Sequence, residues 1–557
     1  MSRHSNSPRN LAAGAAFVLA LIVPNAFACT QLADSLDRAD AFMENTYGGT
    51  NAGAAIMVMD GDTTSLSAYG MADIEWQQPN TTDTSFRIGS ISKPLTALAV
   101  LQLAEEGRLD LGQPVGHYLP DLPDQLGAPS VRDLLSHMSG LPDHFALPSI
   151  PQIMRNPIAP DAIVALMADA ELQFEPGQRW AYSNFNYVLL AQLVAARDPQ
   201  GRPYETVLNE RIFDPAGMDD AHYDRQAAII PRRAAGYDHD GDTTVNTITA
   251  ETSLAHGAGS LMASAEDMLA FTQALRDNRL ARPDTLASAW QSRTTPDNEE
   301  TGYGLGFNVG EFLGERAIWH TGSINGFQSV WMYLPDSGRA VAILSNGYYL
   351  PNVTTSACRI LADLAGQPVP DFAEQALDEA YWRPFEGRYR LEDGSLLQLH
   401  VQDGIRYNLD NGRWRELAWA GGRLLYWPDS LAHLQFTASP EADGSVLTYV
   451  GPLLDSRVAQ RDVGALEGIQ VSTPLNPEES RSLVGRWEMA SGDIFTIRAK
   501  DDGLTLQLPG QPPAAIHRSG PRTYFQRSAP ISLILSETGD RVRINLYGSE
   551  FDLVRAD

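Results

Sequence analysis

Lysine is almost absent from this sequence. Its 41 basic residues include only two lysines, Lys93 and Lys500, and the others are arginines. A guanidinium stays protonated in proteins, whereas an ammonium can lose its proton when it is removed from water. A position that must release and take back a proton can therefore use lysine but not arginine, which makes Lys93 a candidate for such a position.

Positive charge as a whole is scarce, because the 557-residue chain has 69 acidic residues and a formal net charge of -28. Binding of nucleic acid requires a basic face that neutralises phosphates, so this composition argues against a nucleic-acid partner. The acidic excess fits solubility, and it also fits long-range attraction of cationic substrates. We expect a small-molecule or short-peptide substrate, and the composition leaves the oligomeric state open.

Cysteine is equally rare, with Cys29 and Cys358 as the only two. An exported chain can join them in a disulfide, although their spacing does not show that they meet. His137 and His144 have no partner cluster for zinc. The acidic stretch Asp238–Thr243 lacks the glycine and the final acid of a calcium loop. We therefore expect no metal and no cofactor.

Long hydrophobic runs are missing outside the first 28 residues. There, two arginines precede the apolar run Leu11–Val23, and small residues follow it up to Ala28. This order predicts a secretory signal peptide cleaved near Ala28, and the run is too short for a comfortable membrane span. We expect a periplasmic or secreted protein without a transmembrane segment after signal removal. A membrane anchor and a lipoprotein modified at Cys29 are the less favoured alternatives.

The remaining chain is too long for one hydrophobic core. Beyond a linker at 367–376 the sequence changes to short alternating strands, and Gly387–Tyr389 recurs there as Gly485–Trp487. Such a repeat predicts two copies of one all-β module, each a small barrel or sandwich. The predicted domains are a signal peptide at 1–28, a catalytic domain at 29–366, and β modules at 377–472 and 473–557.

The region 29–366 predicts an α+β domain with one antiparallel sheet flanked by helices. Strand patterns open and close the region, and a long, mostly helical insertion separates them. The run Pro94–Gly107 is apolar nearly all round, which predicts a central buried helix that stops at Gly107. The other expected elements are a helix at 32–45, strands at 53–60, 63–70, 317–323, 326–334 and 339–347, and a helix at 354–364.

Ser90 stands three residues before Lys93, at the expected start of this buried helix. The spacing places both side chains on one helix face, where the amine can reach the hydroxyl. A helix N-terminus favours negative charge on the serine oxygen and disfavours the charged ammonium. Ser90 and Lys93 are therefore candidates for a nucleophile and its base. A surface lysine beside a helix cap is the alternative.

Two further motifs follow in the chain. Tyr182-Ser183-Asn184 lies in the insertion, and His320-Thr321-Gly322 lies on an expected strand. Together with the Ser90-x-x-Lys93 motif they resemble the three-motif pattern of the serine β-lactamases and penicillin-binding proteins, of the class C type. The resemblance covers about residues 32–364 and implies a β-lactamase/transpeptidase-like domain.

The resemblance also implies a role for each motif residue. Ser90 would form an acyl-enzyme, and Lys93 with Tyr182 would relay the proton. The backbone N–H groups of Ser90 and Ser323 would form the oxyanion hole. The expected catalytic residues are Ser90, Lys93, Tyr182 and His320, and the expected substrate-binding residues are Asn184, Thr321, Gly322 and Ser323.

The third motif departs from the pattern, because most β-lactamases and D,D-peptidases have lysine where this chain has His320. A neutral imidazole does not supply the fixed positive charge that meets a substrate carboxylate. Histidine at this position, with two C-terminal β modules, is similar to the D-stereospecific aminopeptidases, whose modules are eight-stranded barrels. In those enzymes a loop of the last barrel meets the substrate amine. We expect that loop at Leu508–Arg522, which contains no acidic residue.

The resemblance thus predicts an exported serine hydrolase that acts through Ser90 on amide or peptide bonds, with D-configured N-terminal residues among its substrates. The alternatives are a β-lactamase-like carboxylesterase, a β-lactamase or D,D-carboxypeptidase, and a penicillin-binding sensor that acylates without turnover. Sustained turnover separates the hydrolases from the sensor.

Overall fold

The structure is a computed structural model, and it divides into two compact units. The first holds most of the chain up to Val369, and the second holds the C-terminal β region. The signal peptide predicted at 1–28 lies largely outside the described residues. These are residues 23–556 except 148, 241–242, 249, 368, 370–371, 392–394, 403, 410–414, 428–430, 438–445, 452–455, 463–474, 490–493, 501–502, 509–512, 527–530 and 547–548.

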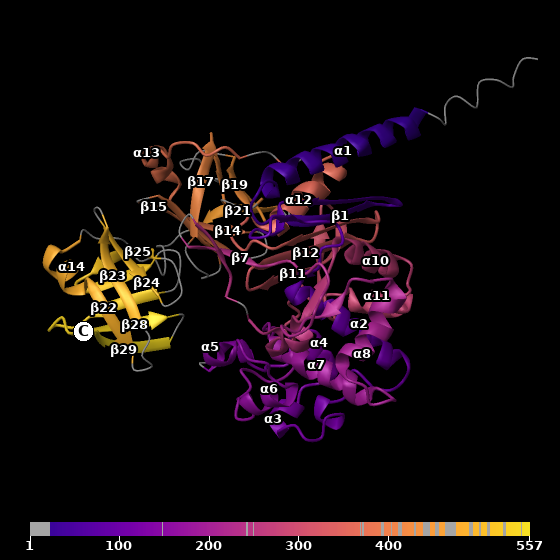
Figure 1. Cartoon of the computed structure of the whole chain (residues 1–557). Coiled ribbons are helices and arrows are strands. Elements are labelled where there is room, and N and C mark those ends of the chain that lie inside the picture. The colour runs from indigo at the N-terminus through magenta and orange to yellow at the C-terminus, as the bar shows by residue number, and fades with distance from the viewer. Residues whose placement is uncertain are drawn as a thin grey trace, which may run out of the picture. The chain divides into compact units, whose positions relative to one another are not determined.

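The first unit is built on a six-stranded sheet, which confirms the predicted α+β class (Figure 1). Its first strand in sequence, β1, pairs antiparallel with the late strand β13, so the helical insertion begins and ends at one sheet. In spatial order the strands are β10 (Asn308–Phe312), β11 (Glu315–Ile324), β12 (Phe327–Leu334), β13 (Arg339–Ser345), β1 (Ala54–Asp60) and β2 (Thr63–Tyr69).

Helices cover both faces of this sheet (Figure 1). On one side α12 (Val353–Leu364) packs on β12 and β13 and against α1 (Val23–Tyr47). On the other side α10 (Ala265–Arg276) packs on β1 and β13, where the Trp331 indole donates a 2.9 Å hydrogen bond to Thr272. Cys358 in α12 is a buried free thiol, and burial raises its pKa to about 12. It forms no disulfide with any side chain that the structure describes, and the side chain of Cys29 lies outside these.

The helix that follows Ser90, α2 (Ser92–Glu105), is the predicted central helix, and nearly all of its side chains are buried. Pro94 lies in its first turn, where a missing N–H costs no helical hydrogen bond. Just beyond its last residue Gly107 adopts a φ of +69°, a conformation that favours glycine after a helix. A helix that is apolar nearly all round is therefore packed against other parts of the domain on almost every side.

The insertion between β2 and β10 is mostly helical, as expected. Two of its helices, α4 and α7, pack on each other, and α7 also packs on α2. Besides α2, its helices are α3 (Asp124–Gly127), α4 (Val131–Leu135), α5 (Ile150–Ile153), α6 (Pro160–Leu166), α7 (Asn184–Arg197), α8 (Tyr204–Leu208), α9 (Asp214–Ala216), α10 and α11 (Pro283–Ala289). Its short strands are β3 (Met71–Asp73), β4 (Gln78–Pro79), β5 (Phe86–Arg87), β6 (His222–Tyr223), β7 (Tyr237–Asp240), β8 (Thr243–Asn246) and β9 (Leu261–Ala263).

The C-terminal region forms two closed eight-stranded barrels, each with its last strand paired to its first. The first comprises β14 (Gly387–Leu391), β15 (Leu396–Val401), β16 (Ile405–Leu409), β17 (Arg415–Gly421), β18 (Leu424–Tyr426), β19 (His433–Phe436), β20 (Val446–Val450) and β21 (Ser456–Asp462). The second comprises β22 (Gly485–Met489), β23 (Ile494–Lys500), β24 (Gly503–Gln507), β25 (Ala514–Gly520), β26 (Thr523–Gln526), β27 (Ile531–Leu535), β28 (Arg541–Leu546) and β29 (Ser549–Arg555). Short helices α13 (Glu379–Trp382) and α14 (Pro477–Leu483) precede them.

The repeated sequence motif places a buried aromatic residue at the same position on the first strand of each barrel. In the first barrel the buried Tyr389 donates a hydrogen bond to the carbonyl oxygen four residues earlier. In the second barrel the buried Trp487 does the same at 2.8 Å. The preceding glycines, Gly387 and Gly485, adopt φ values of +151° and +148°. At equivalent positions the two modules therefore share a backbone conformation and a buried aromatic side chain.

The loop expected at Leu508–Arg522 is corrected by the structure. Its second half contains the regular strand β25, Ala514–Gly520, which pairs with β24 and β26. Residues 509–512 lie outside the described residues. Proline-rich sequence suggested a loop there, but the alternation that begins at Ala514 places Ile516 in the barrel core. Alternation of inward and outward side chains with a period of two is the pattern of a barrel strand.

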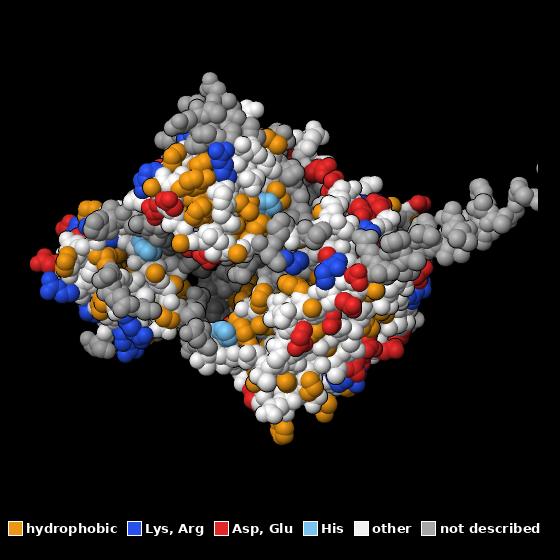
Figure 2. Space-filling model, turned by 90° about the horizontal axis from the view of Figure 1, so that it is seen from above, with side chains coloured by type: hydrophobic (Ala, Val, Ile, Leu, Met, Phe, Trp, Pro, Cys, Tyr) orange, Lys and Arg blue, Asp and Glu red, His pale blue; other side chains and the backbone are white. Residues whose placement is uncertain are grey.

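The acidic residues of this strongly acidic chain are spread over its surface. Figure 2 shows acidic side chains scattered over the visible face rather than gathered in one patch. Within the described residues no helix is long and apolar enough to span a membrane.

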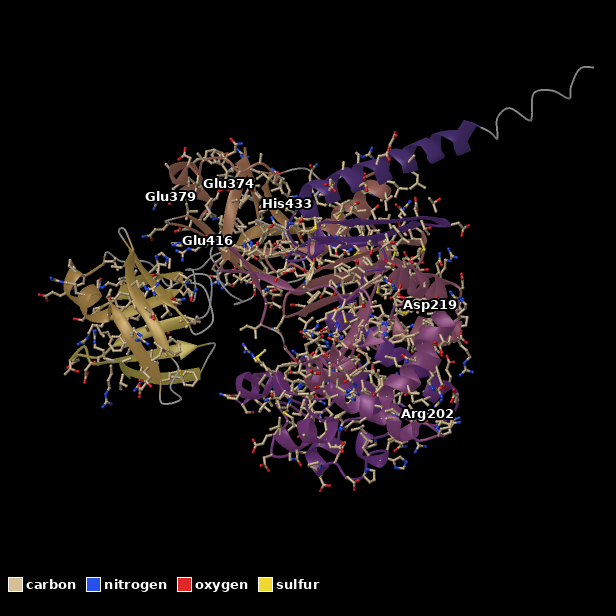
Figure 3. The ribbon with its side chains drawn as sticks, viewed as in Figure 1. Arg202, Asp219, Glu374, Glu379, Glu416 and His433 are labelled. Carbon is tan, nitrogen blue, oxygen red and sulfur yellow. The ribbon has the colours of Figure 1, made fainter. Side chains whose placement is uncertain are left out.

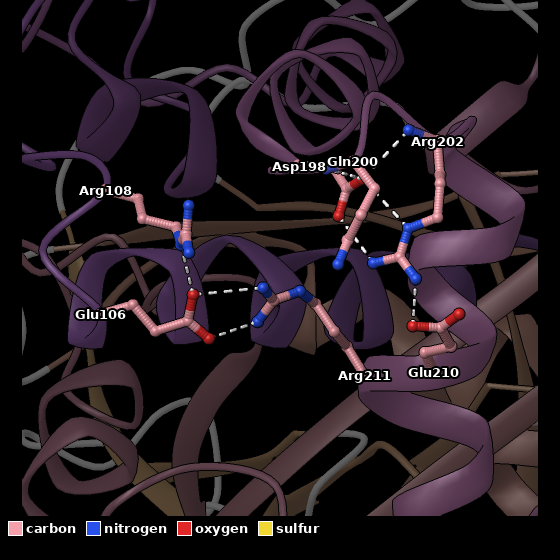
Figure 4. Close-up of polar contacts among 7 residues, drawn as sticks. All are labelled: Glu106, Arg108, Asp198, Gln200, Arg202, Glu210 and Arg211. Atoms are coloured by element: carbon pink, nitrogen blue, oxygen red, sulfur yellow. Dashed lines mark hydrogen bonds and ion pairs between the residues drawn. The ribbon is translucent and has the colours of Figure 1, made fainter.

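Two groups of ion pairs tie the helical part of the first unit together (Figure 4). Arg211 donates to Glu106, which lies just after α2, at 2.7 Å. Arg202, labelled in Figure 3, binds the buried Asp198 at 2.8 Å and also contacts Glu210. These charges are compensated by neighbours of opposite sign.

Candidate active site

Ser90 and Lys93 meet as the spacing predicts. Ser90 lies in a short turn of helix, Gly89–Ile91, that leads into α2, and Lys93 Nζ donates to Ser90 Oγ at 3.0 Å. Gly89 allows this turn to approach β11, because a Cβ atom there would lie 2.8 Å from the backbone nitrogen of Ser323. The nucleophile candidate is thus held between α2 and β11.

Lys93 is fully buried and has only neutral acceptors. Besides Ser90, its ammonium donates to Asn184 Oδ1 at 2.8 Å and to the Ala258 carbonyl at 2.9 Å. Burial lowers the pKa of Lys93 to about 7, and the negative charge of Asp143 opposes part of that shift. At neutral pH a large fraction of Lys93 is therefore uncharged and able to accept a proton.

Tyr182 lies beside this pair, with its ring centre 4.7 Å from Lys93 Nζ. Although 36% of the residue is exposed, loss of solvent around its hydroxyl raises the pKa of Tyr182, and the Ser90 hydroxyl offsets only part of that effect. The phenol therefore stays protonated at neutral pH, whereas Lys93, with its lowered pKa, can be neutral and ready to accept a proton. This division of roles favours Lys93 as the base and Tyr182 as a relay.

Asn184 is the first residue of α7, and both ends of its side-chain amide are occupied. Its oxygen faces Lys93, while its Nδ2 donates to Asp143 Oδ2 at 2.7 Å. The Asp143 side chain is 25% exposed, so a carboxylate reaches the solvent beside the catalytic centre. Asp143 belongs to none of the three sequence motifs, and it stands in the loop after α4, distant in sequence from Asn184.

His137 supports the Tyr182 segment from behind. Its carbonyl accepts the Ala181 N–H at 2.9 Å, and its Nδ1 accepts the Ser183 N–H at 3.2 Å. Its ring packs on Tyr182 with centroids 4.3 Å apart, and its φ is +56°. Burial holds the pKa of His137 well below its ordinary value, so a neutral imidazole braces this segment.

The third motif lies on β11 as expected. His320 is buried, its Nδ1 donates to the Thr321 carbonyl at 2.8 Å, and its Nε2 accepts from Tyr303 at 3.0 Å. Burial and then the charge of Lys93 lower the pKa of His320 to about 3. The imidazole is therefore neutral, and both ring nitrogens are engaged. Gly322 is required by contact, since a Cβ there would lie 2.0 Å from the Ile88 carbonyl oxygen.

A cavity of about 290 Å³ opens beside the nucleophile and brings Ser90, Asn184 and Ser323 together. The rest of its wall is largely apolar, with Glu251 as the acidic residue among its described lining. Among the described residues that line it there is no arginine or lysine, and those with larger apolar side chains are Phe145, Ile150, Met154, Leu254 and Ile324. Within the described part of the chain, no group of three or more histidine, cysteine or acidic residues is placed to hold a metal ion.

Comparisons with known proteins agree with this arrangement. Residues 38–365 match the Beta-lactamase family. PbpX of Bacillus subtilis (strain 168), a penicillin-binding protein by name, is 34% identical over 46% of this chain and 62% of its own length. A D-aminopeptidase of Brucella anthropi is 31% identical over 50% of this chain. The chain spans about half the length of that relative, 52%.

A solved structure is similar as well. The D-amino acid amidase from Ochrobactrum anthropi SV3, in complex with L-phenylalanine, has 28% sequence identity and a TM-score of 0.52 over 60% of this chain and 98% of that one. The family predicted from the three motifs is thus confirmed, and so is the enzyme class. The chain belongs to the beta-lactamase family and is a serine hydrolase.

Proposed function

We propose that this protein hydrolyses the amide bond after an N-terminal residue with a free amine, with a preference for D-configured and apolar residues, through an acyl-enzyme on Ser90. The observation that carries the proposal is the 3.0 Å contact between Ser90 Oγ and a buried lysine whose pKa is about 7. The names of the similar D-aminopeptidase and D-amino acid amidase support the substrate class. Export by the N-terminal segment is part of the same proposal.

Acylation begins at Ser90. Neutral Lys93 Nζ takes the hydroxyl proton while Oγ attacks the substrate carbonyl carbon. The backbone N–H groups of Ser90 and Ser323 stabilise the oxyanion, and donors of that kind contribute about 3 kcal/mol each to lowering the barrier. The intermediate then expels the amine, which leaves with the proton returned by Lys93 through Tyr182. Water, activated by the same pair, hydrolyses the acyl-enzyme and restores Ser90.

His320 affects the choice of substrate because it is neutral at a position where a lysine would be positively charged. Its neutral ring offers no positive charge to a terminal carboxylate, and the cavity beside Ser90 has no arginine or lysine among its described lining residues. Penicillins and peptides with a free carboxylate next to the scissile bond are therefore disfavoured.

Asp143 is the acidic group that the sequence could not assign. Because its carboxylate already takes the Asn184 Nδ2 donor, this side of the site presents negative charge rather than an amide N–H. An α-ammonium is the substrate group that such a carboxylate attracts. The apolar side chains of Phe145 and Leu254 then suit an apolar residue next to that amine.

The test is a comparison of kcat/KM for D-phenylalanine amide, L-phenylalanine amide and a p-nitrophenyl ester, with Ser90→Ala as the control. We expect sustained D-selective amide turnover that Ser90→Ala abolishes. Asp143→Asn is expected to raise KM for the amine-bearing amides and to leave KM for the ester unchanged. Ester turnover without amide turnover would overturn the proposal in favour of a carboxylesterase. A higher kcat/KM for a penicillin than for the amides, or a single acylation without turnover, would also overturn the proposal.

A further inference from the structure

A second and larger cavity lies in the helical part of the first unit. It has a volume of about 1100 Å³, whereas protein sites for small molecules usually measure about 300–1,000 Å³. Ser90, Lys93 and Asn184 are not part of its wall. The wall is formed by the loops 118–123 and 157–159, by α6 and α7, and by Tyr204, Tyr223 and His256.

The short segment His256–Ala258 links this cavity to the active site. His256 lines the large cavity, whereas Ala258 lines the cavity beside Ser90 and its carbonyl accepts the Lys93 ammonium. Between them, Gly257 is tightly enclosed, since a Cβ there would lie 2.6 Å from the Tyr187 carbonyl oxygen. A displacement of His256 would therefore be passed to the acceptor of Lys93, because the segment has little room to absorb it.

A hydrogen-bonded chain runs in parallel to this segment. The Thr96 hydroxyl lies 2.7 Å from Tyr204 Oη and donates to the Gly257 carbonyl at 2.7 Å. Thr96 stands on α2, one turn after Lys93. The large cavity is thus joined to the catalytic helix through Tyr204 as well as through His256.

The wall next to this segment is aromatic. The rings of Tyr204, Tyr223 and His256 lie with centroids 5.0 to 6.1 Å apart. His256 is 5% exposed and has a φ of +42°. Its Nδ1 lies 2.9 Å from the Tyr223 hydroxyl, while its Nε2 makes no hydrogen bond with any described residue. A ring nitrogen at a cavity wall that has no protein partner can form a hydrogen bond with a ligand or with water.

The charges around the cavity are mainly negative. Its acidic lining residues are Asp121, Asp161 and Glu205. The one basic residue among the described lining, Arg225, is paired with Glu205 at 2.6 Å and lies 5.0 Å from the ring centre of Tyr223, which leaves the Tyr204 and His256 rings without a cation. Among the described residues, Asp121 and Asp161 have no ion-pair partner. Aromatic faces together with uncompensated carboxylates attract an organic cation, by cation–π and charge attraction.

We propose that this cavity binds an organic cation with an apolar or aromatic body, such as an arylalkyl amine, and that occupation alters acylation of Ser90 through the segment His256–Ala258. The binding part stands on its own, whereas the coupling part rests on the proposed roles of Ser90 and Lys93.

Binding is tested by isothermal titration of the full chain with phenethylamine. Ala165→Trp fills the cavity from α6, and Ala162→Trp makes the same change on the same helix at a residue that does not line it. We expect Ala165→Trp to weaken binding at one site by about tenfold or more, and Ala162→Trp and Asp143→Asn to leave that site unchanged. Asp161→Asn, which keeps the side-chain shape, should weaken it as well. Equal affinity in Ala165→Trp and Ala162→Trp would overturn the site.

Coupling is tested with the hydrolysis of a neutral p-nitrophenyl ester at increasing phenethylamine concentration. We expect kcat to change without competition for the ester, and the change to disappear in Ala165→Trp but not in Ala162→Trp. An unchanged kcat at saturating amine would overturn the coupling. Neither measurement requires that amide bonds be cleaved, so failure of the proposed function would be seen separately.

Discussion

Two groups of titratable residues in the first unit are treated in opposite ways. At the centre, Lys93 is surrounded by neutral acceptors, and burial brings its pKa to about 7. At the edge, Arg202 faces Asp198 and Glu210 (Figure 4), and these charges raise the pKa of Arg202 above its ordinary range. Pairing fixes a charge, whereas desolvation without a partner makes the charge easy to lose. The difference separates groups that serve stability from groups that serve proton transfer.

The largest effect is expected from Lys93→Arg, which replaces a group that can lose its proton by one that cannot. We expect kcat for ester and amide substrates to fall by about 1,000-fold or more, since loss of a general base costs about 10²–10⁴ in rate. The measurement is the burst of p-nitrophenol in a stopped-flow assay, with circular dichroism to establish folding. Lys500→Arg is the matched control and should keep the normal rate. Near-normal acylation in a folded Lys93→Arg protein would refute the role of Lys93.

The next effect concerns His137, which braces the segment that includes Tyr182. His137→Asn tolerates the positive φ but removes the ring that packs on Tyr182, and we expect kcat to fall by about 10- to 100-fold with little change in KM. The exposed His117 provides the control substitution, His117→Asn. Because the pKa of His137 is far below neutral, the shape of the pH–rate profile should stay the same. A change in KM alone would argue against this role.

A smaller effect is expected in the pH dependence of acylation. Lys93 must be neutral to act, so kcat/KM for an ester should rise with pH through about 7 and then level off. Asp143 holds the pKa of Lys93 up, and Asp143→Asn should therefore move the rise to lower pH. The measurement is a pH–rate profile from about pH 5 to 9. A flat profile, or a shift to higher pH, would contradict the assignment.

The smallest effect is expected at the paired charges. Arg202→Met leaves the buried carboxylate of Asp198 without its main partner, so Tm should fall by about 2–4 °C while kcat stays constant. Arg155, which is exposed and has no ion pair with the described residues, gives the control Arg155→Met. Thermal unfolding followed by circular dichroism measures both variants. If Arg202→Met lost activity at an unchanged Tm, the paired charges would not differ in role from the catalytic residues around Lys93.

Much of the architecture could be predicted because its causes are local. The three motifs specify Ser90, Lys93 and Tyr182 through short spacings, and the apolar run after Ser90 required a buried helix. Asp143 and His137 could not be assigned in the same way, since their roles come from loops that the fold brings beside α7. The large cavity was also invisible, because no single stretch forms it. The domain limits and the catalytic roles remain predictions that the variants above test.

The pairing of β1 with β13 sets the order in which the molecule can be assembled. During synthesis β1 leaves the ribosome long before its partner, which arrives only with residues 339–345. Until then its apolar side chains have one sheet neighbour, β2, and the catalytic helix has no finished sheet to pack on. Pairings of such long sequence separation are slow to form, because loop-closure entropy must be overcome first. The first unit is thus committed to folding late, as a whole, and any helper that holds nascent chains would meet β1 and β2 as an open hairpin.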